Sequence, residues 1–119
     1  MTDNEILESA ALAVGKEISF GPDGILYRNK GEQYWKGWWN PRENSGDALE
    51  LAAMLRLKIE PGKYLGDGCT VYASPAWNDV ASCTAFRDNA VDQMRVAILR
   101  VAAEIGKVAY RYKPKKEES

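Results

Sequence analysis

The stretch VDQMRVAILRVAAEIGKV, residues 91–108, carries the strongest structural signal in the sequence. Its apolar residues recur at steps of three and four, while most charged residues occupy the remaining positions, as in an amphipathic helix. The apolar stripe consists of Val91, Met94, Ile98, Val101, Ile105 and Val108. Asp88 or Asn89 is suited to cap the start of this helix. We therefore expect a long helix near the end of the chain that packs its stripe on other elements.

Three more apolar residues of this helix lie outside the main stripe: Val96, Leu99 and Ala103. A sheet of the same chain could cover them, and so could a second copy of the chain. Both alternatives stay open at this point, and a homodimer is one of the partners that the sequence permits.

The preceding residues predict two more helices and two hairpins. A Gly-Pro-Asp-Gly turn at residues 21–24 separates two short β-rich runs, which is typical of a hairpin. The expected elements are helix 3–14, strands 17–20 and 25–27, helix 45–57, strands 69–73 and 80–86, and the last helix. Segment 30–44 is expected to be an aromatic loop or a ragged strand. The order α-β-β-α-β-β-α predicts an α+β fold in which the helices pack on a small, mainly antiparallel sheet.

Length and composition favour one small globular domain. The 119 residues are 45% hydrophobic and 28% charged, with a formal net charge of −1. We expect a single domain over residues 1–109 and a charged, flexible tail over residues 110–119. The first residues lack the basic start of a secretion signal, and no run is long and apolar enough to span a membrane. A cytoplasmic location is the simplest expectation.

No catalytic centre can be recognised in the sequence. The chain has no histidine, which removes the commonest general base and most zinc sites, and its glycines form no phosphate-binding loop. Asp47 and Glu50 are spaced as neighbours on a helix, but Asp47 is better explained by a place in the first turn of that helix. We therefore expect no enzyme activity, no metal site and no cofactor.

Cys69 and Cys83 are the only cysteines. In a reducing compartment they would be buried thiols that behave as small hydrophobic residues. If the two strands that carry them pair about a turn near Ala76, Cys69 falls roughly opposite Cys83. A cross-strand disulfide is therefore a second alternative.

The aromatic segment 34–42 is the best candidate for a binding site. Trp and Tyr are enriched in interface hot spots, and aromatic residues beside basic residues can stack on nucleic-acid bases. The candidate residues are Trp35, Trp38, Trp39, Asn40 and Arg42. The structural alternative is that two or three of the rings close one end of the core. Neighbours in an extended segment face opposite sides, so Trp38 and Trp39 cannot both point inward.

A basic stretch near the end of the chain could contact phosphates. It consists of Lys107, Arg111, Lys113, Lys115 and Lys116. Glu117 and Glu118 follow directly, and the chain as a whole is slightly acidic. A solvated tail is the alternative explanation, and phosphate binding would predict an affinity that falls steeply with salt.

Two blocks of the sequence resemble a known family. WNP at 39–41 with GDALELA at 46–52 is the first block, and RVAILRVAAEIG at 95–106 is the second. Together with the first helix ending at Gly15, they resemble small phage and prophage proteins of the phage ABA sandwich domain family. The resemblance implies a helix–sheet–helix layering, a phage origin and expression in the bacterial cytoplasm. It brings no catalytic residues.

The leading functional hypothesis is a phage accessory protein that binds a host or phage macromolecule, with a protein as the expected partner. One alternative is a protein that binds or sequesters a small nucleotide-like ligand between aromatic rings. Another is a weak nucleic-acid binder that uses the basic C-terminal tail.

Overall fold

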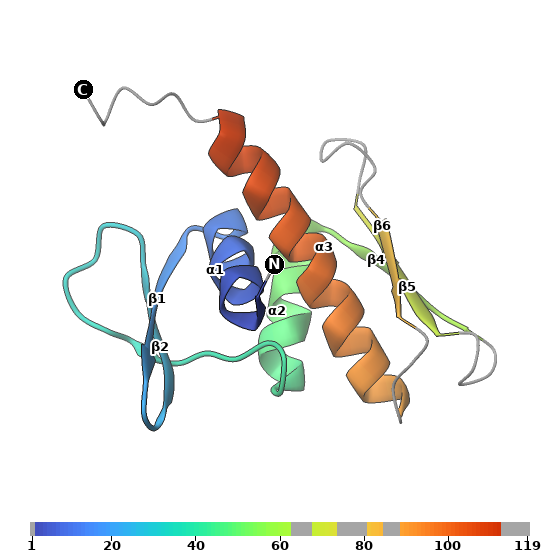
Figure 1. Ribbon diagram of the computed structural model, residues 1–119, viewed down its shortest axis with the longest axis horizontal. Coiled ribbons are helices and arrows are strands. Elements are labelled where there is room, and N and C mark those ends of the chain that lie inside the picture. Colours follow the sequence, from blue (N-terminus) through green and yellow to red (C-terminus); the bar gives the residue numbers. More distant parts are fainter. Residues whose placement is uncertain (1, 63–67, 74–80, 85–88, 113–119) are drawn as a thin grey trace.

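The computed structural model describes residues 2–62, 68–73, 81–84 and 89–112. Within these residues the element order is α-β-β-β-α-β-β-β-α (Figure 1). The elements are α1 (Asp3–Ala13), β1 (Lys16–Gly21), β2 (Gly24–Asn29), β3 (Gly37–Trp38), α2 (Ser45–Leu55), β4 (Lys58–Pro61), β5 (Cys69–Tyr72), β6 (Ala81–Thr84) and α3 (Ala90–Tyr112). The predicted α+β class is confirmed, and the short strands β3 and β4 add to the predicted order.

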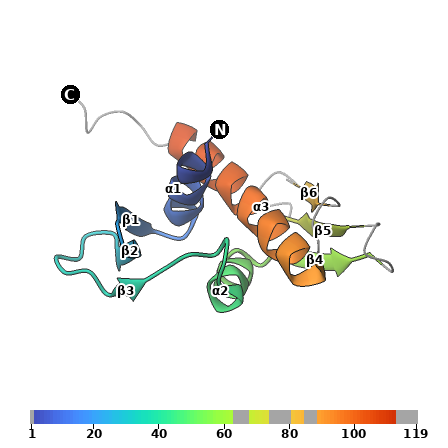
Figure 2. The ribbon, with the colours of Figure 1, turned by 60° about the horizontal axis from the view of Figure 1, so that its bottom comes forward.

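The strands form two sheets rather than one. The first sheet has the order β1-β2-β3 and the second β4-β5-β6, and all neighbouring strands are antiparallel. The helices lie between the two sheets, as Figures 1 and 2 show from two directions. This layering reverses the helix–sheet–helix arrangement that the family resemblance implies.

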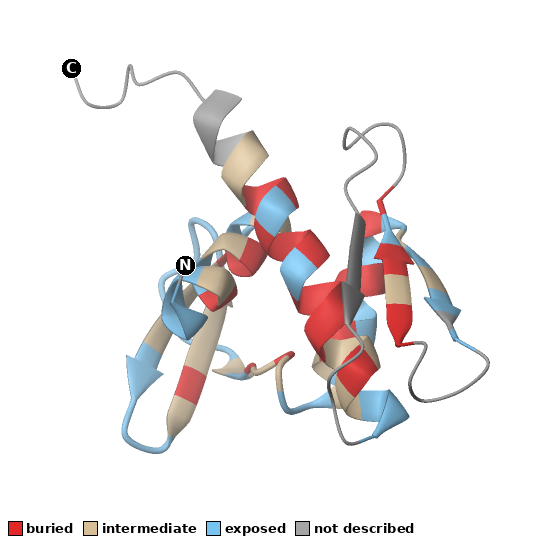
Figure 3. Cartoon of the chain, turned by 45° about the vertical axis from the view of Figure 1, so that its right-hand side comes forward, coloured by how far each residue is buried: buried red, intermediate tan, exposed pale blue. Residues whose placement is uncertain are grey.

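The middle of helix α3 is buried on most sides, because other elements pack on several of its faces. It packs on α1 and α2 and also on β5 and β6, and Figure 3 shows buried residues along it. Val96, Leu99 and Ala103, which lie outside the main stripe, are buried within the single chain. No second copy is needed to cover them.

Helices α1 and α3 approach each other closely at Gly106. A Cβ atom built on Gly106 would overlap the backbone carbonyl of Ser9 in α1. Ala10 and Ala102 are completely buried in the same core. Small residues therefore let the two helix backbones come together without a side chain between them.

The helix starts are set by side-chain caps. Thr2 caps α1 through a capping box: its Oγ1 accepts from the Glu5 N–H at 3.2 Å, and Glu5 Oε1 accepts from the Thr2 N–H at 2.7 Å. These hydrogen bonds hold the pKa of Glu5 below its ordinary value. Thr2 therefore serves as the cap, although Asp3 and Asn4, the next two residues, are also of types that favour this position. Asn44 caps α2, and Asn89, one of the two residues predicted, caps α3.

Lys16 joins the first sheet to α2. Only 7% of this residue is exposed, its ammonium lies 4.5 Å from the centre of the Tyr27 ring, and Glu50 Oε1 of α2 is 3.8 Å away. At such a site the aliphatic part of the lysine side chain is buried, while its ammonium group makes favourable contacts with an aromatic ring and a carboxylate.

The register of the second sheet does not place the two cysteines opposite each other. Cys69 pairs with Thr84, and Cys83 pairs with Thr70. The predicted pairing is therefore off by one residue. The turn expected near Ala76 lies outside the described residues.

Helix α3 continues to Tyr112, beyond the domain end predicted at residue 109. The basic residues Lys113, Lys115 and Lys116 lie outside the described residues. Across the part of the chain that the structure describes, no helix is both long enough and apolar enough to cross a membrane.

Candidate functional site

The two faces of the first sheet differ in character. The register places Ile18 opposite Tyr27, and both pack against the core. On the other face Glu17 lies opposite Arg28, and Leu26 lies between Ser19 of β1 and Trp38 of β3. Side chains alternate along a strand, so this second face points away from the helices.

Trp38 and its neighbour Trp39 are divided between the two faces. Trp38 is 61% exposed, whereas Trp39 is 1% exposed and belongs to the core. The N–H of Trp39 donates to the Ile25 carbonyl at 2.9 Å, which keeps this segment extended beside β2. The structure therefore agrees with the argument that only one of the two rings could point inward.

The exposed ring of Trp38 lies against the hairpin turn. A Cβ atom on Gly24 would lie 3.2–3.3 Å from two ring carbons of Trp38. Gly24 also has a positive φ of 143°, which a residue with a side chain rarely adopts. The ring thus lies against the backbone of Gly24 while most of its surface meets solvent.

Trp35 lies over Arg28 on the same outer side of the sheet. The Arg28 guanidinium carbon is 4.4 Å from the centre of the Trp35 ring, a cation–π distance. Arg28 Nε also donates to Glu17 Oε1 at 2.8 Å, and an NH1 group donates to the Gln33 carbonyl at 3.2 Å. Leu26, Arg28, Trp35 and Trp38 together are called the outer aromatic face below.

The loop that carries Trp35 is anchored at both ends. The Asn29 N–H donates to Glu32 Oε1 at 3.0 Å, which holds the pKa of Glu32 below its ordinary value. The Lys36 N–H donates to the Tyr27 carbonyl at 2.7 Å. Tyr34, at the outer part of the loop, is 76% exposed. The loop therefore adds a second aromatic group to the edge of the outer aromatic face.

Asn40 and Arg42, two of the predicted binding residues, form the turn between β3 and α2. Asn40 Oδ1 accepts from the Arg42 N–H at 3.1 Å, and the Asn40 N–H donates to Asp47 Oδ2 at 2.8 Å. Arg95 of α3 donates to the Arg42 carbonyl at 3.1 Å and to Ser45 Oγ at 3.0 Å. The two sequence blocks that carry the family resemblance thus meet in one hydrogen-bond network.

This network predicts a structural role for Arg95. Arg95→Met should lower the free energy of unfolding by about 2 kcal/mol, because it removes two charge-assisted hydrogen bonds and leaves the Arg42 carbonyl without this donor. Arg100→Met is the matched control, since Arg100 is exposed on the same helix and makes no hydrogen bond or ion pair with the described residues. Urea unfolding measures both variants, and equal midpoints would contradict the assigned role.

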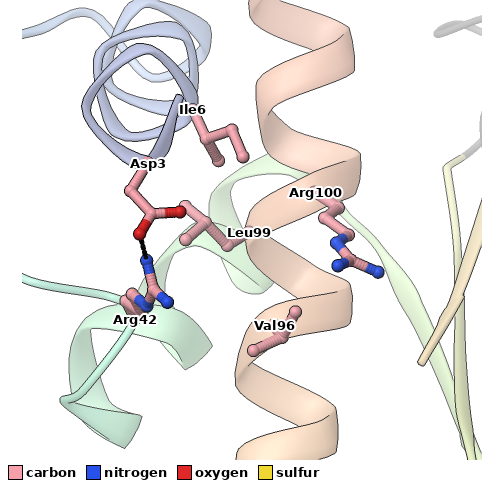
Figure 4. A pocket seen from close by; sticks show the side chains of 6 residues that line it. All are labelled: Asp3, Ile6, Arg42, Val96, Leu99 and Arg100. Atoms are coloured by element: carbon pink, nitrogen blue, oxygen red, sulfur yellow. Dashed lines mark ion pairs between the residues drawn. The ribbon is translucent and has the colours of Figure 1, made fainter. Parts of the chain in front are cut away.

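Arg42 also lines a small pocket between α1 and α3 (Figure 4). Its guanidinium forms an ion pair with Asp3, and Ile6, Val96 and Leu99 make the wall apolar. The pocket volume of about 50 Å³ is far below the roughly 300 Å³ at which small-molecule sites begin. This pocket could hold water but not a nucleotide.

A larger open groove of about 380 Å³ borders Trp38. It lies between the β1–β2 turn, β3 and the start of α2, and it is lined by Trp38 together with three carboxylates, Asp23, Glu43 and Asp47. We call it the acidic groove. Among the described residues no three metal-ligating side chains lie close enough together to hold an ion.

Sequence reasoning missed the acidic groove. The predicted site combined the aromatic residues with Arg42, yet the Arg42 guanidinium pairs with Asp3. The carboxylates come from two separate segments, the hairpin turn and the start of α2, so no local motif identifies them. Only the packing of the hairpin turn beside the start of α2 brings them together.

Comparison with known proteins gives no relative: no family model, curated protein or solved structure matches the chain.

Proposed function

We propose that this chain is a non-catalytic binding protein that holds a partner protein on its outer aromatic face. The observation that supports this most directly is that Trp38 is 61% exposed and its ring lies against Gly24. A rigid, exposed tryptophan loses little conformational entropy when a partner covers it, and Trp, Tyr and Arg dominate interface hot spots. The family resemblance adds the proposal that the partner is a host or phage protein in the bacterial cytoplasm.

The nucleotide alternative has weaker support. Phosphate groups need free cations or free backbone donors. The cations beside the aromatic rings are already engaged, with Arg28 on Glu17 and Lys36 on Glu32. The charged side chains that line the groove beside Trp38 are all carboxylates. A protein surface suits this face better than a phosphorylated ligand does.

Trp38→Ala should weaken binding of the partner by about 30-fold or more while the protein stays folded, which is the size of effect expected at a hot spot. The partner is first captured from phage-infected bacterial lysate on the wild-type protein and then purified for affinity measurements. Trp35→Ala should weaken binding by a smaller factor, because Trp35 is 40% exposed and partly covered by Arg28.

Tyr72→Ala is the matched control, since Tyr72 is an exposed aromatic residue on β5 of the second sheet. It should bind the partner as the wild type does. Equal affinity of the wild type and Trp38→Ala would refute the proposed face. Quenching of tryptophan fluorescence by ATP or a cyclic nucleotide, lost in Trp38→Ala, would favour the small-ligand alternative instead.

A further inference from the structure

The acidic groove combines an aromatic face with excess negative charge. Trp38 forms one wall, Asp23 belongs to the hairpin turn beneath its ring, and Glu43 and Asp47 come from the segment that enters α2. No lysine or arginine lines the groove. Within the described part of the chain, none of these three carboxylates forms an ion pair.

Several of the groups around the groove that could attract an anion are already used. The Asp47 N–H in the first turn of α2 donates to the capping Asn44 Oδ1 at 2.9 Å. The N–H of Asn40 donates to the Asp47 carboxylate at 2.8 Å. The nearby Arg42 guanidinium pairs with Asp3 on the side of α1. The groove therefore favours a cation, and its charge is complementary to a basic group.

We propose that the acidic groove receives an arginine side chain from a basic segment of the partner protein, an inference that rests on the proposed function. A guanidinium can stack on the exposed ring of Trp38 and donate to the carboxylates beside it at the same time. A compact ammonium cannot match both contacts as well, because it lacks the planar fork. The groove volume of about 380 Å³ is ample for one arginine side chain with its neighbouring backbone.

A random peptide library displayed on a carrier and panned on the wild-type protein tests the chemistry directly. Peptides that bind should be enriched in arginine at one position beside apolar residues. The best peptide is then synthesised twice, once with arginine and once with citrulline, which has nearly the same shape but no charge. Citrulline should weaken binding to the wild type by about tenfold, from one cation–π contact and exposed ion pairs.

The double variant Asp23→Asn/Glu43→Gln tests whether the weaker binding of the citrulline peptide depends on the carboxylates of the groove. On this variant the arginine and citrulline peptides should differ by less than about threefold, because two of the three carboxylates are neutral and only Asp47 and the Trp38 ring still favour the cation. Glu8→Gln/Glu104→Gln is the matched control: it removes two exposed carboxylates far from the groove and should keep the tenfold preference. Asp47 is left intact because its carboxylate holds the turn.

The outcomes separate this inference from the proposed function. Peptides that need Trp38 but show no preference for arginine would overturn the acidic-groove inference and leave the binding face standing. An arginine preference that persists in Asp23→Asn/Glu43→Gln would also overturn it. A panning experiment that enriches no peptide, alongside equal partner binding by Trp38→Ala and the wild type, would remove both proposals.

Discussion

Replacing Gly106 with alanine should lower the thermal midpoint of unfolding by more than about 10 °C. The added Cβ would overlap the backbone carbonyl of Ser9, and a backbone atom cannot rotate away as a side chain can. Helices α1 and α3 would have to separate, which would open the packing around Ala10 and Ala102. The expected loss is about 3–4 kcal/mol, a large share of the roughly 5–15 kcal/mol that stabilises a domain.

The direction of the change in stability distinguishes the effect of helix packing from that of helix propensity. Alanine is favoured over glycine inside a helix by about 1 kcal/mol, so local propensity alone predicts a stabilising change. Gly21→Ala in β1 is the control, because its Cβ would meet only the Gly24 carbonyl at an ordinary 3.5 Å. Thermal unfolding followed by circular dichroism compares the two. A Gly106→Ala midpoint within about 2 °C of the wild type would show that α1 and α3 are not in this close contact.

The long last helix could be predicted because its signal is local. Spacings of three and four residues in 91–108 define a stripe without knowledge of the rest of the chain. Its partners could not be predicted, because periodicity says which face is buried and not what buries it. Gly106 illustrates the difference: nothing near it in the sequence indicates that Ser9, close to the other end of the chain, lies against it.

The strands were harder to predict than the helices. The hairpin β1–β2 has a clear Gly-Pro-Asp-Gly turn, whereas β3 contains only Gly37 and Trp38, and β4 ends at Pro61. Such short strands exist because a neighbouring strand offers hydrogen bonds, and their own residues carry little signal. The same reason explains the register error at the cysteines, since a shift of one residue changes the face on which each position lies.

The candidate site was predictable only in part. Because side chains alternate in an extended segment, Trp38 and Trp39 must face opposite sides, but the sequence does not show which ring is exposed. Two contacts determine this: the Trp39 N–H donates to the Ile25 carbonyl, and the Trp38 ring packs on Gly24. Asn40 and Arg42 were proposed to contact a partner, and in the structure their polar groups join the turn network. The acidic groove depends on tertiary packing alone.

Variants of the adjacent residues Trp38 and Trp39 test the assignment of one ring to the binding face and the other to the core. Trp39→Ala should lower the free energy of unfolding by about 3–5 kcal/mol, the usual cost of removing a large buried aromatic side chain. Trp39 is 1% exposed and packs in the same core as Ala48 and Leu51 of α2. Urea unfolding followed by circular dichroism at 222 nm measures the change, because that signal does not depend on the tryptophan removed.

Trp38→Ala is the natural control for Trp39→Ala, and it should cost less than about 1 kcal/mol because most of the ring is already in water.

Trp39→Phe refines the test. Trp39 Nε1 has no hydrogen-bond partner among the described residues, so phenylalanine loses ring volume but no hydrogen bond and should fall between the two alanine variants. Similar losses for Trp38→Ala and Trp39→Ala would contradict the assignment of one ring to the core and the other to the binding face. If Trp39→Ala alone unfolds the protein readily while Trp38→Ala alone loses the partner, stability and binding are carried by neighbouring residues on opposite sides of one extended segment.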